Sequence, residues 1–275
     1  MRAELAIRLS RAGDGTVVAR GDLARTPFWC RWTGDVLWFV GSAATPVGDD
    51  DITIDVHVGE GVDATVRSVA AMVVYAARGQ GTTLTTRLHV ESGARLVWQP
   101  EPVIVTARAR HRSLLAADVD ADGTLVVDDL VVLGRSDEEA GAFRSATEVR
   151  RDGVPLSLTS FDTATPGWSG PGGTAGAKVI GTRLLVEADA LSEPPVDPPA
   201  DATTVVLRPE AGGALATTLA ATPDAARARL DTVLPVPSPR VHATPPEVVP
   251  LLDAERAAEG PDLVQNDRAP SAVRF

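Results

Sequence analysis

The sequence predicts an all-β protein with about two helices, in which short strands form a layered, β-helix-like arrangement. The composition is the first observation behind this prediction. Hydrophobic residues make up 44% of the 275 residues but aromatic residues only 4%, so the core must consist mainly of Val, Leu, Ala and Ile. Branched side chains such as Val, Ile and Thr favour strands, because they suit a pleated surface. Alternating apolar residues and regularly spaced glycine turns are the other two observations.

Strict alternation of apolar and polar residues marks the strands. In residues 52–58, Ile52, Ile54, Val56 and Val58 fall on one face and polar residues on the other. The same alternation runs through 84–90 and 103–109. Further strands are expected at 36–40, 125–127, 130–133, 178–186 and 203–207. Residues 84–156 are therefore predicted to be a series of strands separated by turns.

Four turns of related form recur along the chain. In each one, a strand is followed by a short polar turn, a glycine and another strand. The glycines are Gly61, Gly93, Gly123 and Gly153, separated by 32, 30 and 30 residues. Such a period indicates stacked or successive β-hairpin layers in a solenoid-like fold. The alternative is chance alignment, since any all-β protein has a turn every 8–12 residues or so.

Two segments have the pattern of a helix. Thr222, Pro223 and Asp224 resemble an N-cap, a proline at the first helical position and an acidic residue in the first turn. The alanine-rich segment 225–234 follows, and prolines from Pro235 onward end it. A second, weaker helix is expected within 250–259.

The domain organisation follows from the loops and the tail. Segments 163–176 and 193–199 are rich in Gly, Pro, Ser or Thr and are expected to be long loops. Residues 1–234 are predicted to form a single β domain. The Pro-rich, charged segment 235–275 is predicted to be a C-terminal tail that is partly disordered.

Charge and targeting features exclude several classes of partner. The net charge is −11, so binding to the phosphates of nucleic acid or to an anionic membrane is not expected. Cys30 is the single cysteine, which rules out an intrachain disulfide. Residues 1–8 lack the apolar stretch of a signal peptide, and no apolar run approaches the roughly 20 residues needed to span a bilayer. We therefore expect a cytoplasmic protein, and a secreted carbohydrate-active β-solenoid enzyme is disfavoured.

The segment from Asp118 to Asp129 matches a calcium-loop pattern. Asp118, Asp120 and Asp122 alternate ahead of Gly123, and Asp129 stands at the twelfth position. A calcium hand needs a helix on each side, whereas the residues that follow Gly123 form a strand-like valine run. An acidic turn in the glycine series is the simpler interpretation, and a calcium- or metal-binding β protein is the alternative.

Two histidines occupy related positions in successive repeats. His57 lies four residues before Gly61, and His89 lies four residues before Gly93. If the layers stack in register, the two imidazoles become neighbours on the polar face and could form a weak transition-metal site. The alternative is a pair of solvated histidines, and no third ligand is evident.

No motif for nucleophilic or phosphate chemistry is present. The sequence has no G-x-S-x-G, no H-E-x-x-H, no P-loop and no G-x-G-x-x-G after a strand. Abundant carboxylates in an acidic chain are not evidence of acid–base catalysis. A protein that is not an enzyme is therefore expected.

Three motifs in a fixed order resemble those of the urease accessory protein family UreD, also named UreH. The first is GARLVWQPEP at 93–102. The second is LGR at 133–135, followed by Glu139 and Gly141, and the third is DGVPL at 152–156. The resemblance, which is of the actinobacterial type, covers about residues 49–156 and continues loosely to 234. At Val73 the sequence departs from the family, which usually has a lysine there.

The resemblance implies a function that the residues alone do not supply. Members of this family are chaperones of urease maturation that bind apo-urease and recruit the accessory proteins UreF and, through it, UreG. Nickel then passes to the urease, and a water-filled passage through the accessory protein has been proposed as its route. No tightly bound cofactor is implied, only transient passage of Ni²⁺. The family fold is β-helix-like with two helices, in agreement with the prediction above.

The matched motifs also suggest which residues contact nickel or a partner. A transfer path should offer its ligands singly, so that each releases the ion. Candidates in or beside the motifs are Trp98, Glu101, Asp128, Asp129, Arg135 and Glu139. The alternative is structural: Arg135 pairs with a carboxylate to hold strands together, and Trp98 and Pro100 belong to the core and a turn.

Overall fold

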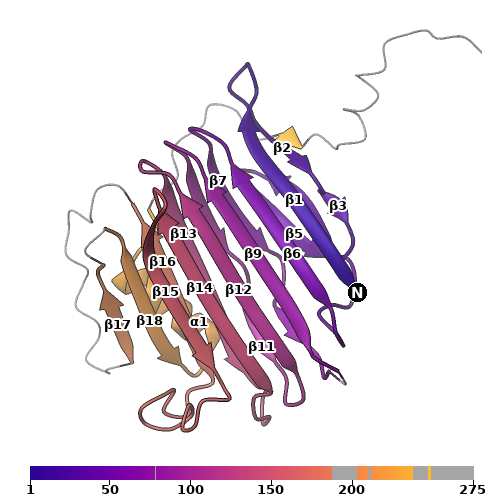
Figure 1. The fold of residues 1–275 in the computed structure, drawn as a ribbon, viewed down its shortest axis with the longest axis vertical. Coiled ribbons are helices and arrows are strands. Elements are labelled where there is room, and N and C mark those ends of the chain that lie inside the picture. Colours follow the sequence, from indigo (N-terminus) through magenta and orange to yellow (C-terminus); the bar gives the residue numbers. More distant parts are fainter. Residues whose placement is uncertain (78, 188–202, 210–211, 238–246, 249–275) are drawn as a thin grey trace, which may run out of the picture.

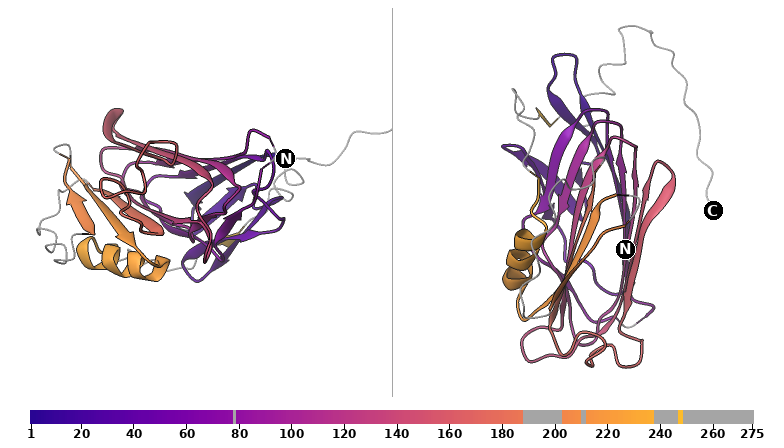
Figure 2. Two further views of the ribbon diagram at one scale, coloured as in Figure 1. Left: turned by 90° about the horizontal axis from the view of Figure 1, so that it is seen from below. Right: turned by 90° about the vertical axis from the view of Figure 1, so that its left-hand side faces the viewer.

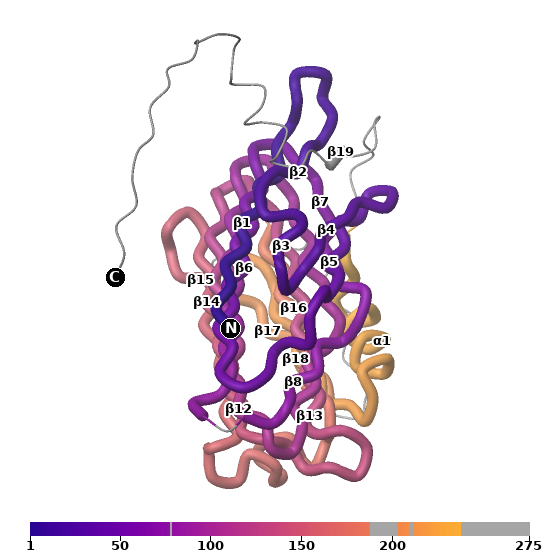
Figure 3. Tube along the Cα trace, turned by 90° about the vertical axis from the view of Figure 1, so that its right-hand side faces the viewer, coloured from indigo at the N-terminus to yellow at the C-terminus, as the bar shows by residue number. Residues whose placement is uncertain are grey.

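Two β-sheets face each other across an apolar core, and one helix covers the outside of the second sheet (Figure 1, Figure 2). The computed structural model describes residues 1–77, 79–187, 203–209, 212–237 and 247–248. Figure 3 shows the molecule with the side near β1 (Arg2–Arg11) turned towards the viewer. In this view, β1 lies on one side and β5 (Val36–Gly41) lies on the other. The predicted layered, all-β fold is confirmed.

The first sheet, sheet A, has eight strands among the described residues. In order across the sheet they are β15 (Val154–Asp162), β14 (Ala142–Arg151), β12 (Arg110–Val119), β9 (Thr82–Val90), β6 (Asp51–Val58), β1, β2 (Val17–Gly21) and β19 (Glu247–Val248). The run from β14 to β1 is parallel. Parallel neighbours require a crossover after every strand, and the second sheet supplies it.

The second sheet, sheet B, receives the chain after β2, β6, β9, β12 and β15 of sheet A. Its strands in order are β17 (Thr204–Leu207), β18 (Ala214–Ala220), β16 (Val179–Val186), β13 (Thr124–Leu133), β10 (Arg95–Gln99), β7 (Asp63–Ser68), β5, β4 (Phe28–Thr33) and β3 (Ala24–Arg25). Two short strands, β8 (Met72–Val74) and β11 (Val103–Val105), pair with each other, and β11 also pairs with β13. Sheet B is parallel from β5 to β13 and antiparallel on either side.

The glycine series marks the stacked turns, with one correction. Gly61 and Gly93 both have a positive φ, and the Gly61 amide donates to Ser92 O at 3.1 Å. These two turns and the turn at Gly123 carry the chain from sheet A to sheet B, so they are not hairpins. Gly153 alone of the four closes a hairpin, between antiparallel β14 and β15. The repeat is therefore a solenoid coil rather than a stack of hairpins.

The predicted strands match the structure except at two places. The alternation at 103–109 predicts one strand, but β11 ends at Val105 because a turn follows, in which the Ala109 amide donates to Thr106 O at 2.9 Å. Ala107 and Ala109 are therefore outside the strand. Residues 125–127 and 130–133 are one continuous strand, β13, instead of two.

The described helix begins and ends close to where the sequence predicts. Helix α1 (Pro223–Val233) has Thr222 as its N-cap, and Thr222 Oγ1 accepts from the Ala225 amide at 3.3 Å. Its buried residues Ala226 and Leu230 face sheet B at Gly181, where a Cβ would lie 3.2 Å from Ala226 Cβ. The second predicted helix lies outside the described residues. No helix that the structure describes is long and apolar enough to cross a membrane.

Few residues of the predicted tail are described. Arg95, paired with buried Asp63 at 2.7 Å, also donates to the carbonyl of Pro237. Glu247 and Val248 form β19, which pairs with β2 at one edge of sheet A. The predicted loop 193–199 and most of the tail, whose partial disorder stays a prediction, lie outside the described residues.

Candidate functional site

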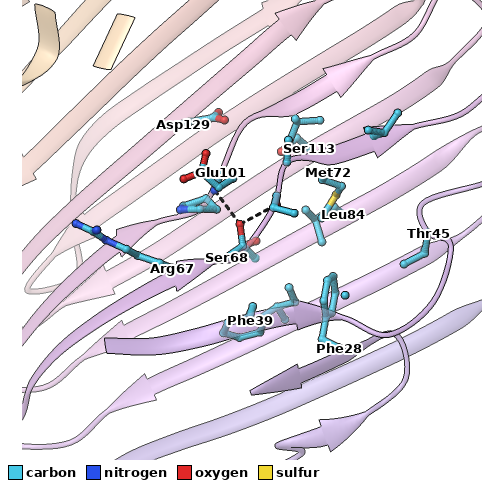
Figure 4. Close-up of a pocket in the computed structure, with 18 of the residues that line it drawn as sticks. Phe28, Phe39, Thr45, Arg67, Ser68, Met72, Leu84, Glu101, Ser113 and Asp129 are labelled. Atoms are coloured by element: carbon cyan, nitrogen blue, oxygen red, sulfur yellow. Dashed lines mark hydrogen bonds between the residues drawn. The ribbon is translucent and has the colours of Figure 1, made fainter. Parts of the chain in front are cut away.

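A cavity of about 300 Å³ lies between the two sheets. Most of its wall is apolar, and Leu84 from sheet A and Val66 from sheet B contribute to it. A few polar groups point into this apolar space (Figure 4). The polar residues of the wall include Ser68, Thr86, Glu101, Ser113 and Asp129. A largely apolar cavity with a few polar groups is the usual form of a small-ligand site.

Asp129 is the inward-facing carboxylate of β13. Successive side chains of a strand point to opposite faces. Val127 belongs to the core between the sheets, while Val126 and Leu130 pack with residues of α1, so Asp129 shares the inner face with Val127. Burial, and then the neighbouring Asp128, raises the pKa of Asp129 to about 6. Its charge is therefore sensitive to a nearby cation.

Asp128 points to the other face of β13 and is held in a buried network. Its two carboxylate oxygens accept from Arg183 Nε at 2.6 Å and from Arg183 Nη2 at 2.7 Å. Arg183 also donates to Asp231 at 2.8 Å and to Leu234 O at 2.9 Å, which attaches α1 to sheet B. Asp128 is thus neutralised by Arg183 and acts as a structural anchor of the helix.

Glu101 lies at the boundary between the cavity and a second hollow beside α1. Its amide donates to Ser68 Oγ at 2.8 Å, and its Oε2 accepts from Arg227 Nη2 at 3.3 Å. The second hollow, about 380 Å³ in volume, also has Glu101 and Arg67 in its wall. The other residues of that wall are Gln99, Arg227, Asp231, Pro235 and Val236. We refer to this hollow as the α1 groove.

The remaining predicted residues separate into two groups. Trp98 is buried, lines the cavity and packs edge-on against Phe39 at a centroid distance of 5.7 Å. Arg135 and Glu139 are exposed in the loop between β13 and β14. Arg135 Nη2 pairs with Glu138 at 2.7 Å, which raises the pKa of Arg135 and lowers that of Glu138 to about 2. The structure therefore brings Trp98, Glu101 and Asp129 together around the cavity and places Arg135 and Glu139 elsewhere.

The residues that match the calcium-loop pattern do not surround a single point in the structure. Asp118 lies on β12 in sheet A, whereas Asp129 lies on β13 in sheet B. Asp120 Oδ2 accepts from the Ser92 amide at 3.0 Å, so this carboxylate stabilises the stacked turns. Within the described part of the chain, no three side chains of His, Cys, Asp or Glu are grouped so as to hold a metal ion.

Several residues of this region are absent from the sequence prediction. Arg183 is fully buried within a predicted strand, and a lone charge in an apolar strand is a signal that could have identified it. Arg227 and Asp231 are four residues apart, so they share one face of α1. Asp231 contacts Arg183 of β16, and Arg227 contacts Glu101 in the loop after β10. Ser68, at the end of β7, carries no sequence pattern of its own.

Comparison with known proteins gives one consistent family. A family model described as UreD urease accessory protein matches residues 1–250. The chain is 32% identical over 262 residues to "Urease accessory protein UreD" of Parafrankia sp. (strain EAN1pec), covering 85% of this chain and 88% of that protein. It is 30% identical over 232 residues to "Urease accessory protein UreD 1" of Saccharopolyspora erythraea, covering 80% and 89%. A similar protein of Streptomyces coelicolor is 31% identical over 194 residues, covering 69% and 76%.

Proposed function

Because the chain belongs to the UreD urease accessory protein family, we propose that it is a non-catalytic scaffold that supports nickel insertion into apo-urease. In this role it bridges apo-urease to UreF and, through UreF, to UreG, in the cytoplasm. The nickel ion is cargo and not a resident cofactor. A single β domain at residues 1–234 carries this function, and the tail 235–275 is an extension of it.

The observation that carries the proposal is the pair of carboxylates in the cavity. Asp129 faces the space between the sheets, and Glu101 borders both this space and the α1 groove. Carboxylates that are offered one at a time bind a divalent cation weakly, which suits transfer rather than storage. A cation that moves from the groove to the cavity meets Glu101 first and Asp129 second.

The electrostatics of the two carboxylates favour a moving cation. The pKa of Asp129, raised to about 6 by burial and by Asp128, leaves it ionised at pH 7 at a cost in free energy. A passing divalent cation relieves this cost. Glu101 is held by Arg227 in a half-exposed ion pair at 3.3 Å, and such pairs contribute at most about 1 kcal/mol, so a cation can replace the guanidinium.

The test is reconstitution of urease maturation in a host that supplies the urease subunits, UreF and UreG. The variants are Asp129→Asn and Glu101→Gln, with Asp122→Asn, an exposed turn residue, as the matched control. We expect normal capture of UreF by all three. We expect a lower nickel content of purified urease for the first two only. Full nickel content in the double variant would contradict the interior route, and failure of the wild-type chain to capture UreF would contradict the scaffold role.

A further inference from the structure

A line of polar side chains crosses the outer face of sheet A, on the opposite side from the cavity. Strand pairing places five residues at matched positions on β1, β6, β9, β12 and β14. In order, they are Arg8, His57, His89, Asp118 and Arg150. The residues that flank the two histidines along their strands, such as Val56 and Leu88, are buried in the core, so the imidazoles point outward.

The two histidines are close neighbours, as stacking in register predicts. Their ring centroids are 5.8 Å apart, and the ring planes are inclined by 28°. Two carboxylates flank the pair. Glu91 Oε1 contacts His57 Nε2, and Asp118 Oδ2 lies 4.0 Å from His89 Nδ1. Side-chain exposures of 33% for His57 and 50% for His89 leave both imidazoles accessible from solvent.

We infer that His57 and His89 form a surface site for a divalent transition-metal cation such as Ni²⁺ or Zn²⁺. Imidazole nitrogen suits these cations, whereas Mg²⁺ and Ca²⁺ prefer oxygen ligands. One imidazole from each of two adjacent strands binds the ion, and Glu91 or Asp118 supplies a carboxylate after a change of side-chain rotamer. Among the described residues no third ligand is already in place. The remaining coordination positions belong to water, and the ion is exchangeable.

The charges around the pair favour a cation. Each guanidinium that faces the two histidines is already engaged by a carboxylate: Arg8 by Glu91 at 3.2 Å, Arg87 by Asp55 at 3.4 Å and Arg150 by Glu148 at 2.8 Å. Asp118 adds a further negative charge beside His89. The face therefore carries one more carboxylate than guanidinium among these groups, which raises the local concentration of cations.

This site is separate from the interior route and goes beyond the proposed function. Sheet A lies between the histidines and the cavity, so substitutions on its outer face leave Glu101 and Asp129 in place. The outer-face site captures a cation from solvent, whereas the interior carboxylates form a path. Either of the two can be wrong without affecting the other.

The experiment is calorimetric titration of the full-length chain with NiCl₂ at pH 7.5, with MgCl₂ as the comparison ion. His57→Gln and His89→Gln are each expected to weaken the saturable Ni²⁺ binding by at least about tenfold. The matched control is Glu4→Gln, an exposed carboxylate on β1 that pairs with Arg2 and contacts neither histidine, and its affinity should equal that of the wild type. Circular dichroism confirms that each variant is folded.

A second measurement locates the ion. Sub-stoichiometric Ni²⁺ is paramagnetic and should broaden the imidazole resonances of His57 and His89 before that of buried His111. Wild-type affinity in the His57→Gln/His89→Gln double variant would overturn the inference. So would saturable Mg²⁺ binding of equal strength, or an Asp129→Asn variant that loses the calorimetric signal while both histidines are intact.

Discussion

Arg183 donates two hydrogen bonds to Asp128, and both side chains are almost completely buried between sheet B and α1. A buried charge that loses its partner is left without compensation, which typically costs about 3–5 kcal/mol. Because Arg183 also reaches Asp231 and Leu234 O, it joins β13 to the helix. Arg183, held in place by Asp128, is therefore a buried polar attachment of α1 to sheet B.

The first prediction concerns this attachment. Arg183→Met should lower the free energy of unfolding by about 3–5 kcal/mol, because it leaves Asp128 buried without its cation. Chemical denaturation followed by circular dichroism measures the change. The control is Arg135→Met, which removes an exposed pair with Glu138 and should leave the midpoint unchanged. Equal midpoints for Arg183→Met and the wild type would refute the anchoring role.

The second prediction concerns stability and pH at Asp129. Its folded pKa of about 6 lies above the ordinary aspartate value of 3.8, so the folded state holds its proton more tightly than the unfolded state. Asp129 therefore destabilises the fold above pH 6, and this effect diminishes as the pH falls towards 4. Asp129→Asn should raise the free energy of unfolding at pH 7.5 by about 1–3 kcal/mol. Asp128→Asn, one residue away, should lower it instead, because it weakens the contact with Arg183.

The two substitutions are expected to change the free energy of unfolding in opposite directions although the residues are adjacent, which makes the comparison decisive. Denaturation of the two variants at pH 7.5 and pH 4.5 measures both effects. The gain from Asp129→Asn should fall to roughly a third of its size at the lower pH, because Asp129 in the unfolded state is still largely ionised there. A variant that is more stable but delivers less nickel would indicate that the free-energy cost at Asp129 is retained for function.

The third prediction concerns His111, which is buried on β12 beside Phe143 of the neighbouring strand β14. Its ring stacks on Phe143 at 6.1 Å, and its Nδ1 lies 2.7 Å from Thr82 Oγ1. Burial lowers the pKa of His111 to about 4, below the ordinary histidine value of 6.5. The unfolded state therefore binds the proton first, and stability is lost as the pH falls from 6.5 towards 4. The loss from this residue should be about 2 kcal/mol between pH 7 and pH 5.

His111→Phe separates this contribution from the others. The variant keeps an aromatic ring against Phe143 but has no proton to bind. Its unfolding free energy, measured at pH 7, 6 and 5, should fall less steeply than that of the wild type. Parallel curves for the two proteins would show that His111 does not contribute to acid sensitivity.

Several strands were predicted from the burial of one face, although β1, whose buried residues alternate in the same way, was not predicted. Ile52 and Leu84 begin alternating runs whose inner faces form the core, so the pattern and the structure agree. The alternating pattern wrongly predicted a strand at Ala107 and Ala109, because the pattern continues through the turn that Thr106 O closes. The helix was predictable since its cap, first-turn proline and acidic residue are all local features.

The candidate site was only partly predictable, because its contacts join distant parts of the chain. Family resemblance drew attention to Glu101 and Asp129, but not to their different roles. Glu101 contacts Arg227 from a helix that is 126 residues away in sequence. Neither periodicity nor composition encodes such a pairing. Because successive side chains of a strand point to opposite faces, the inward direction of Asp129 follows once the ends of β13 are known. The pairing of Asp128 with Arg183 does not follow from this alternation.

The fourth prediction tests the close packing of α1 on sheet B. A Cβ at Gly181 would lie 3.2 Å from Ala226 Cβ and 3.3 Å from Leu230 Cδ1. Gly181→Ala should therefore force α1 outward and destabilise the fold by about 1–3 kcal/mol, which thermal unfolding would detect. Gly172→Ala is the control, because no atom lies within 4 Å of the Cβ that it adds. If both variants unfold at the same temperature as the wild type, α1 is not packed as tightly against β16 as these distances require.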